Sequence, residues 1–124
     1  MKICMIGTGY VGLVSGTCFA DLGNRVYCVD KDRSKINKLK NAISPIYEPG
    51  LDDLIRNNFR AKRLNFTDDL ENAVKESQMI FICVGTPTKK IQIWLIFHKY
   101  IVLLNQYLST LKTIKLLLPN PQYL

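Results

Sequence analysis

The chain has 124 residues, a length that suits one domain and is too short for a typical two-domain enzyme. Its formal net charge is +7, but residues 1–89 carry only +3, whereas residues 90–124, which contain no acidic residue, carry +4. This distribution indicates solvated helix surfaces rather than a basic patch that follows a phosphate backbone. We therefore expect no nucleic-acid partner.

The four cysteines, Cys4, Cys18, Cys28 and Cys83, form no C-x-x-C pair, and three of them fall in apolar segments that are strand candidates. This placement predicts reduced, mostly buried thiols and a cytoplasmic protein rather than a disulfide framework. The first residues lead directly into an apolar segment, so we expect no cleavable signal peptide.

The first predicted element is a short apolar strand over residues 3–6, followed at once by a glycine-spaced turn. Gly7, Gly9 and Gly12 have the spacing G-x-G-x-x-G. The first glycine permits a tight turn, the second lets a pyrophosphate approach the backbone, and the third lets the following helix pack closely on the sheet. The amides at the start of that helix would face the phosphates.

The pattern predicts a helix over residues 10–22, which ends at Gly23. Gly16 and Ala20 would allow close contact with the sheet. We expect the apolar stripe of this helix to consist of residues at helical spacing: Val11, Val14, Cys18 and Leu22.

A second strand over residues 26–29 leads into Asp30, which lies 18 residues beyond Gly12. This offset is close to the roughly 20 residues expected for the carboxylate that binds an adenosine ribose. The alternative is that the glycines serve only packing and the acid is merely solvated. Because strand, glycines, helix, strand and acid all occur in register, the pattern favours a dinucleotide-binding fold.

After Asp30 the chain predicts two further helices. Asp32 or Ser34 would cap a basic helix with an apolar side made of Ile36, Leu39 and Ile43. The lysines of this helix indicate a solvated face, and Lys35 alone is near enough to Asp30 to reach a ribose or phosphate. A loop with two prolines and a glycine follows, and then a helix over residues 51–59.

The next elements are a short strand over residues 64–66, a helix capped by Thr67, and a buried strand over residues 79–84. Strands that alternate with helices predict an α/β fold, a Rossmann-type doubly wound sheet with parallel strands and right-handed connections. In such sheets ligands bind beyond the carboxyl ends of the strands. The glycine turn, Asp30 and residues 85–87 all fall at such ends.

These motifs together resemble the UDP-glucose/GDP-mannose dehydrogenase family, and within it the amino-terminal part of the UDP-glucose 6-dehydrogenases. The resemblance runs from Met1 to about Lys89. It is carried by four segments in the family's order: Gly7-Thr-Gly-Tyr-Val-Gly-Leu13, Cys28-Val-Asp-Lys-Asp32, Ile46-Tyr-Glu-Pro-Gly-Leu51 and Val84-Gly-Thr-Pro87.

The resemblance implies an NAD-dependent oxidation of UDP-glucose to UDP-glucuronate, preferred over a GDP-mannose or UDP-N-acetylhexosamine substrate. It implies that the pyrophosphate is held by the glycine-turn residues Gly7, Gly9, Tyr10, Val11 and Gly12. Asp30 and Lys35 would bind the adenosine ribose, and Thr86 would lie along the cofactor. Full-length members are expected to be homodimers, but we expect no dimer of this chain, and we assign it no catalytic or metal-binding residue.

Residues 90–124 depart from the family and contain no Gly, Ala, Asp or Glu. We therefore divide the chain into a partial NAD-binding domain, 1–89, truncated after about its fourth strand, and an aberrant apolar tail, 90–124. A frameshift near Lys89 or Lys90 accounts for the tail, because one set of codons for residues 90–96 encodes Asn-Ser-Asp-Leu-Ala-Tyr in another frame.

Other interpretations of the tail were a membrane-spanning helix and an amphipathic helix that binds a partner. The first is disfavoured because a span needs roughly 20 mainly apolar residues, whereas polar residues interrupt this segment. We therefore expect no membrane association. The alternative to an enzyme is a non-catalytic NAD-binding fragment or a pseudogene product without activity.

Overall fold

A computed structural model describes residues 1–84 of the chain. The predictions for Thr86 and for the segment 90–124 lie outside the described residues. Within this part the chain forms four strands and four helices in the order β1 (Lys2–Ile6), α1 (Tyr10–Asp21), β2 (Arg25–Val29), α2 (Arg33–Lys40), α3 (Leu51–Arg60), β3 (Leu64–Thr67), α4 (Leu70–Glu76) and β4 (Met79–Ile82).

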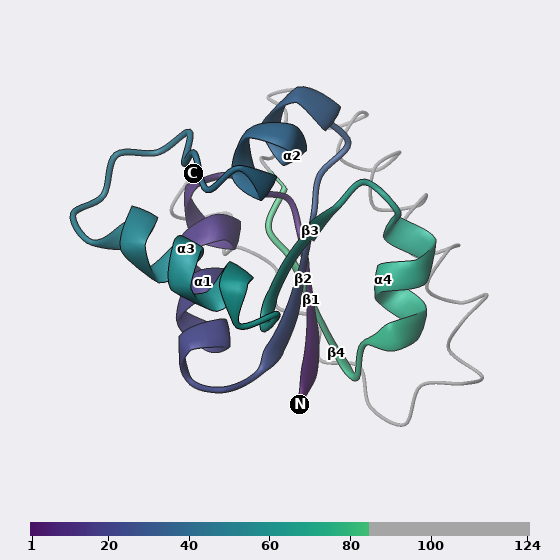
Figure 1. Ribbon diagram of the computed structural model, residues 1–124. Helices are drawn as coiled ribbons and strands as arrows, with labels where there is room; N and C mark the ends of the chain where they lie inside the picture. Colours follow the sequence, from purple (N-terminus) through teal and green to yellow (C-terminus); the bar gives the residue numbers. More distant parts are fainter. Residues whose placement is uncertain (85–124) are drawn as a thin grey trace, which may run out of the picture.

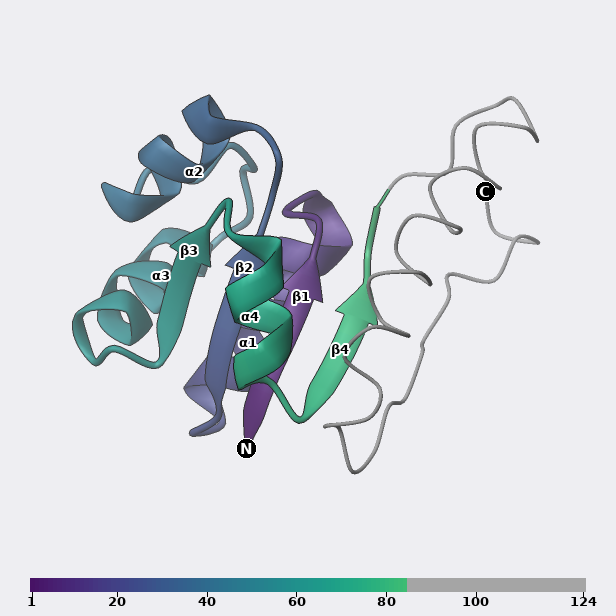
Figure 2. The same ribbon diagram turned by 90° about the vertical axis from the view of Figure 1, so that its right-hand side faces the viewer.

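The four described strands form one sheet in the order β3-β2-β1-β4, and every neighbouring pair is parallel. Figure 1 views the sheet nearly edge-on, with α1 and α3 covering one face and α4 the other. Figure 2 shows β3 and β4 at opposite sides of the sheet. The doubly wound parallel sheet predicted from the sequence is therefore confirmed.

The central strand β1 marks the place where the strand order reverses. Ile6, its last residue, pairs with Val29 of β2 on one side and with Ile82 of β4 on the other. The chain thus moves outward from β1 to β2 and β3, and then returns to the opposite side of β1. Ligands of doubly wound sheets bind at such a reversal, beyond the carboxyl ends of the strands.

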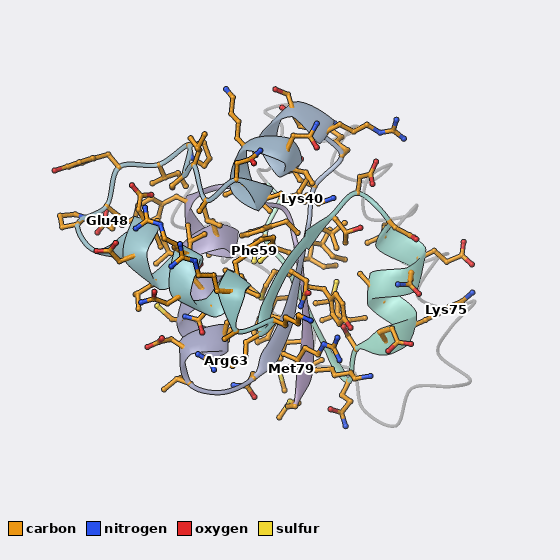
Figure 3. The ribbon with its side chains drawn as sticks, viewed as in Figure 1. Lys40, Glu48, Phe59, Arg63, Lys75 and Met79 are labelled. Atoms are coloured by element: carbon orange, nitrogen blue, oxygen red, sulfur yellow. The ribbon has the colours of Figure 1, made fainter. Side chains whose placement is uncertain are left out.

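Residues of each strand alternate between two cores because successive side chains point to opposite faces. Ile3 and Met5 join the larger core beneath α1, α2 and α3, whereas Cys4 and Ile6 join the core beneath α4. Phe59 of α3 points toward the sheet in Figure 3 and stacks on Phe66 with ring centroids 6.0 Å apart. Burial on both faces explains why β1 and β4 are mainly apolar.

The stripe predicted for α1 is wrong at most of its positions. Val11 and Leu22 are 63% and 78% exposed, and Cys18 is also exposed. The buried face consists of small residues and one leucine: Gly12, Leu13, Gly16, Thr17 and Ala20. The predicted close contact of Gly16 and Ala20 with the sheet is confirmed. A Cβ at Gly16 would lie only 2.9 Å from Sγ of Cys28, so the helix approaches the sheet too closely for larger side chains.

Two predicted helix boundaries also shift. Thr67 belongs to β3, and the residue that caps α4 is Asp69, whose carboxylate accepts a hydrogen bond from the Asn72 amide at 3.0 Å. Asp32, one of the two predicted caps, caps α2. Ile43 lies beyond the end of that helix and is 58% exposed, because α2 ends at Lys40 before Ile43 could turn inward.

Among residues 1–84, no helix is long and apolar enough to cross a membrane.

Candidate functional site

The turn between β1 and α1 depends on a glycine at its first position. Gly7 has φ of +101°, a conformation that side-chain-bearing residues rarely adopt. Its N–H donates to the Val29 carbonyl at 2.7 Å, and a Cβ at this position would lie 2.8 Å from the Cys83 carbonyl oxygen. The turn is therefore fixed against the ends of both β2 and β4.

The other two glycines of the motif have opposite surroundings. A Cβ at Gly12 would overlap the carbonyl oxygen of Gly7 and lie 3.2 Å from Cβ of Cys83, so this glycine lets the helix pack against its own turn. A Cβ at Gly9 would meet no atom of residues 1–84 within 4 Å. Open space beside Gly9 agrees with the prediction that a pyrophosphate can approach the backbone there.

Within the described part of the chain, the first turn of α1 has no side-chain cap. Gly9 occupies the N-cap position without a side-chain hydrogen bond to the helix, and the first turn contains no acidic residue. Tyr10 and Val11, which begin the helix, are 54% and 63% exposed. The first amides of a helix carry the positive end of its dipole, so this uncapped end suits an anionic group such as a diphosphate.

Asp30 lies beside this turn, directly after β2. Its Oδ2 accepts hydrogen bonds from the amide of Thr8 at 3.0 Å and from the hydroxyl of Thr8 at 2.7 Å. Its Oδ1 accepts one from the amide of Asp32 at 3.0 Å. The predicted ribose-binding carboxylate is thus in direct contact with the predicted diphosphate-binding turn.

Lys35 reaches the same carboxylate from the first turn of α2. Its Nζ lies 3.4 Å from Oδ2 of Asp30, and the lysine side chain is 32% exposed. Burial alone would raise the pKa of Asp30, but the hydrogen bonds from Asp32 and Thr8 and the charge of Lys35 outweigh it. The pKa therefore falls from 3.8 to about 2, and Asp30 is ionised at neutral pH.

Thr8 was not identified in the sequence analysis. It occupies the variable position between the first two glycines, and its side chain is only 1% exposed. One signal was available: a hydroxyl-bearing residue next to a glycine turn, with an acid expected nearby, can donate a hydrogen bond to that acid.

The loop before α3, to which no role was assigned, also reaches the site. Glu48, labelled in Figure 3, comes from this loop. Its carboxylate accepts a hydrogen bond from the Tyr10 hydroxyl, and this bond, together with the negative charge, raises the pKa of Tyr10. The loop is therefore linked to the first residue of α1.

Of the cysteines, Cys83 lies nearest to the glycine turn. Burial raises the pKa of its thiol, as it does for Cys4 and Cys28. A raised pKa lowers the thiolate fraction and favours a packing role. No group of three or more histidine, cysteine or acidic side chains that could hold a metal ion occurs in the described part of the chain.

Seven of the eight predicted site residues therefore lie in one region, at the carboxyl ends of β1 and β2: Gly7, Gly9, Tyr10, Val11, Gly12, Asp30 and Lys35. The eighth, Thr86, lies outside the described residues. The geometry fits a dinucleotide, because the open backbone at Gly9 and the uncapped helix suit a diphosphate and Asp30 suits a ribose.

Comparison with known proteins places the chain in a family. Residues 1–118 match the model of the UDP-glucose/GDP-mannose dehydrogenase family, NAD binding domain. This chain belongs to that family. Because the matched region is the NAD-binding domain, the prediction of NAD as the cofactor is confirmed.

Curated relatives are similar over the first part of their own length. The UDP-glucose 6-dehydrogenase of Rhizobium meliloti (strain 1021) is 61% identical over 90 residues, covering 73% of this chain and 21% of the relative. The UDP-glucose 6-dehydrogenase TuaD of Bacillus subtilis (strain 168) is 60% identical over 89 residues, covering 72% and 19%. The chain thus spans about a fifth of the length of these relatives.

Solved structures of the family share the fold. A ternary complex of GDP-mannose dehydrogenase from Pseudomonas aeruginosa has a TM-score of 0.69 and 43% identity, covering 73% of this chain and 21% of that one. The UDP-N-acetyl-mannosamine dehydrogenase Cap5O from Staphylococcus aureus has a TM-score of 0.74 and 29% identity, covering 94% and 28%. These relatives act on different sugar nucleotides, so the shared fold does not by itself select a substrate.

Proposed function

We propose that the chain binds NAD with the pyrophosphate on the segment Gly7–Gly12 and the adenosine ribose on Asp30 and Lys35. The observation that carries the proposal is the pair of hydrogen bonds from Thr8 to Asp30, because it joins the two halves of the site. A dinucleotide bridges a diphosphate-binding turn and a ribose-binding acid that lie next to each other, as these do.

The charge of Asp30 supports NAD rather than NADP as the cofactor. Its pKa of about 2 keeps the carboxylate ionised across the physiological range. An anion at this place accepts a hydrogen bond from a free 2′-hydroxyl and repels a 2′-phosphate. Lys35 has three N–H donors, of which one faces Asp30, so the others can reach ribose or phosphate oxygens.

For the full-length protein we propose oxidation of UDP-glucose to UDP-glucuronate. The reaction converts the C6 alcohol to a carboxylate in two steps, consumes one water, and transfers two hydrides to two NAD⁺. The two relatives of highest identity described above, both UDP-glucose 6-dehydrogenases, support this substrate. The unpaired thiols among the described residues suit a reducing compartment, and we place the protein in the cytoplasm.

The second candidate is that this chain binds NAD without oxidising a sugar. One observation favours it: burial raises the pKa values of three cysteines among the described residues, so these thiols are poor nucleophiles. Turnover requires a sugar held against the nicotinamide and an activated group for the second oxidation. In this proposal the role of the described residues is limited to holding the cofactor.

An activity assay separates the two candidates. The purified 124-residue chain is mixed with NAD⁺ and UDP-glucose, and NADH absorbance is followed. We expect saturable NAD⁺ binding without NADH production from the chain alone. Formation of NADH that depends on UDP-glucose would reject the second candidate.

The cofactor site itself is tested with Asp30→Ala. We expect this change to weaken NAD⁺ binding at least about 10-fold, because a hydrogen bond to a charged group is lost. The preference for NAD⁺ over NADP⁺ should narrow as well. Asp53→Ala is the matched control, since Asp53 lies on α3, is exposed and forms an ion pair with Arg56, the neighbour three residues along the same helix. Equal affinities of wild type and Asp30→Ala would contradict the assignment.

A further inference from the structure

Thr8 is a buried polar residue whose two donors serve one atom. Its amide and its hydroxyl lie 3.0 Å and 2.7 Å from Oδ2 of Asp30, and the residue is 1% exposed. Without its hydrogen bond to Asp30, the hydroxyl would have no role in the turn, and a small apolar side chain would suit this position equally well. Its hydrogen bond links the glycine turn to the end of β2.

The hydrogen bonds leave the two oxygens of Asp30 unequally occupied. Oδ2 accepts from both donors of Thr8 and from Lys35, whose Nζ is 3.4 Å away, whereas among residues 1–84 Oδ1 accepts only from the Asp32 amide. Each carboxylate oxygen has about two lone-pair sites. Oδ1 therefore keeps an acceptor site for an incoming hydroxyl, and the side chain of Asp30 is 13% exposed.

We propose that Thr8 is a positioning residue that orients Asp30 so that Oδ1 accepts the 2′-hydroxyl of the adenosine ribose. The proposal rests on the NAD site proposed above and goes beyond it, because Thr8 itself does not touch the ribose in this arrangement. By holding Oδ2, Thr8 restricts rotation of the carboxylate before the cofactor arrives. A side chain already in its binding orientation loses less conformational freedom when the ligand binds.

The hydroxyl group of Thr8 can be replaced by a methyl group with little change in the shape of the side chain. Thr8→Val keeps the branched side chain, and the backbone amide still donates to Asp30, so only the 2.7 Å bond is lost. Thr8→Ser keeps the hydroxyl and should restore wild-type behaviour. Thr17→Val is the matched control, because Thr17 is equally buried in the neighbouring helix α1 but its hydroxyl donates to the Leu13 carbonyl.

Calorimetry measures the binding of two ligands, NAD⁺ and 2′-deoxy-NAD⁺, which lacks only the 2′-hydroxyl of the adenosine ribose. The proteins are wild type, Thr8→Val, Thr8→Ser and Thr17→Val. We expect wild type, Thr8→Ser and Thr17→Val to prefer NAD⁺ by about 10-fold. In Thr8→Val this preference should fall at least about 3-fold, while affinity for the deoxy analogue changes little. Thermal unfolding checks that each variant is folded, and Thr8→Ala replaces Thr8→Val if valine prevents folding.

The outcomes separate the role of Thr8 from that of Asp30. If wild type prefers NAD⁺ and Thr8→Val keeps the full preference, the role of Thr8 is overturned and the Asp30 assignment stands. If Thr8→Val weakens both ligands equally, Thr8 acts only on the fold and the inference is also overturned. If wild type does not distinguish the two ligands, Asp30 does not bind the 2′-hydroxyl and both proposals fail.

Discussion

Two glycines three positions apart in the turn should respond differently to the same substitution. Gly9→Ala adds a methyl group where no atom of residues 1–84 lies within 4 Å, at a residue with φ of −70° that alanine readily adopts. Gly12→Ala adds the same group against the carbonyl oxygen of Gly7 and 3.2 Å from Cβ of Cys83. The first change should affect the cofactor and the second should affect the fold.

The expected effects on stability follow from these surroundings. At Gly12 the obstacle is backbone of the same turn, which cannot rotate away as a side chain could, so we expect a loss of about 2–4 kcal/mol in the free energy of unfolding. At Gly9 the change should stay within about 0.5 kcal/mol. For NAD⁺ binding the order is reversed: the methyl group at Gly9 occupies the space that the pyrophosphate needs, and affinity should fall at least about 10-fold.

Urea unfolding and calorimetric titration with NAD⁺, performed on wild type and both variants, give these quantities. Gly9→Ala should unfold at the wild-type midpoint and bind NAD⁺ weakly. A Gly9→Ala variant with wild-type affinity would refute the argument that the diphosphate approaches the backbone at this glycine. A Gly12→Ala variant as stable as wild type would refute the close packing of α1 on its own turn.

Three further changes test other parts of the account. The folded pKa of Asp30, about 2, lies below its ordinary value of 3.8, so the residue stabilises the fold above about pH 4 and this contribution is lost as the pH falls through 2. After allowance for solvent screening, this contribution to the free energy of unfolding amounts to roughly 1 kcal/mol. The difference in stability between wild type and Asp30→Asn should therefore narrow below about pH 4. A difference that is independent of pH from 7 to about 3 would contradict this. In native protein a thiol reagent should modify the exposed Cys18 faster than Cys4 and Cys28. Burial raises the pKa of both buried thiols, that of Cys4 to about 12, and so lowers their reactive thiolate fraction. Equal modification rates of the three thiols would contradict the burial of Cys4 and Cys28. Asn58→Leu should cost about 1–3 kcal/mol of stability, because the fully buried amide receives a hydrogen bond from Arg63 and donates one to Asp21; an unchanged urea midpoint would refute that estimate.

The fold and the glycine turn could be predicted because their signals are local. The spacing of Gly7, Gly9 and Gly12 predicts a backbone path, and β1 and β4 are short, mainly apolar runs with their own boundaries. The parallel direction of the strands followed from the alternation of strands and helices, since such connections allow few sheet topologies. The distance of 18 residues from Gly12 to Asp30 was sufficient to place the acid at the same end of the sheet.

The face of α1 could not be read correctly from its hydrophobic residues. Ranking by hydrophobicity favoured Val11 and Leu22, but the distance between helix and sheet decides which residues fit between them. That distance depends on Gly16, because a Cβ at this position would lie only 2.9 Å from Sγ of Cys28. Small residues at this spacing contribute little to a hydrophobic pattern although they lie at its buried centre.

The partner of Asp30 was missed for a related reason. A threonine between two glycines carries no spacing signal, and its contact with an acid 22 positions later exists only once β1 and β2 are paired. The same holds for Glu48 and Tyr10, which belong to a loop and a helix that meet only in the folded chain. Sequence motifs indicated the region that we propose binds the cofactor, whereas the hydrogen bonds that orient its side chains required coordinates.

The measurement that tests the central claim most directly is calorimetric titration of the folded 124-residue chain with NAD⁺. We expect saturable binding of one NAD⁺ per chain, weakened by both Gly9→Ala and Asp30→Ala. A cooperatively folded chain that gives no binding heat with millimolar NAD⁺ at two temperatures would contradict it.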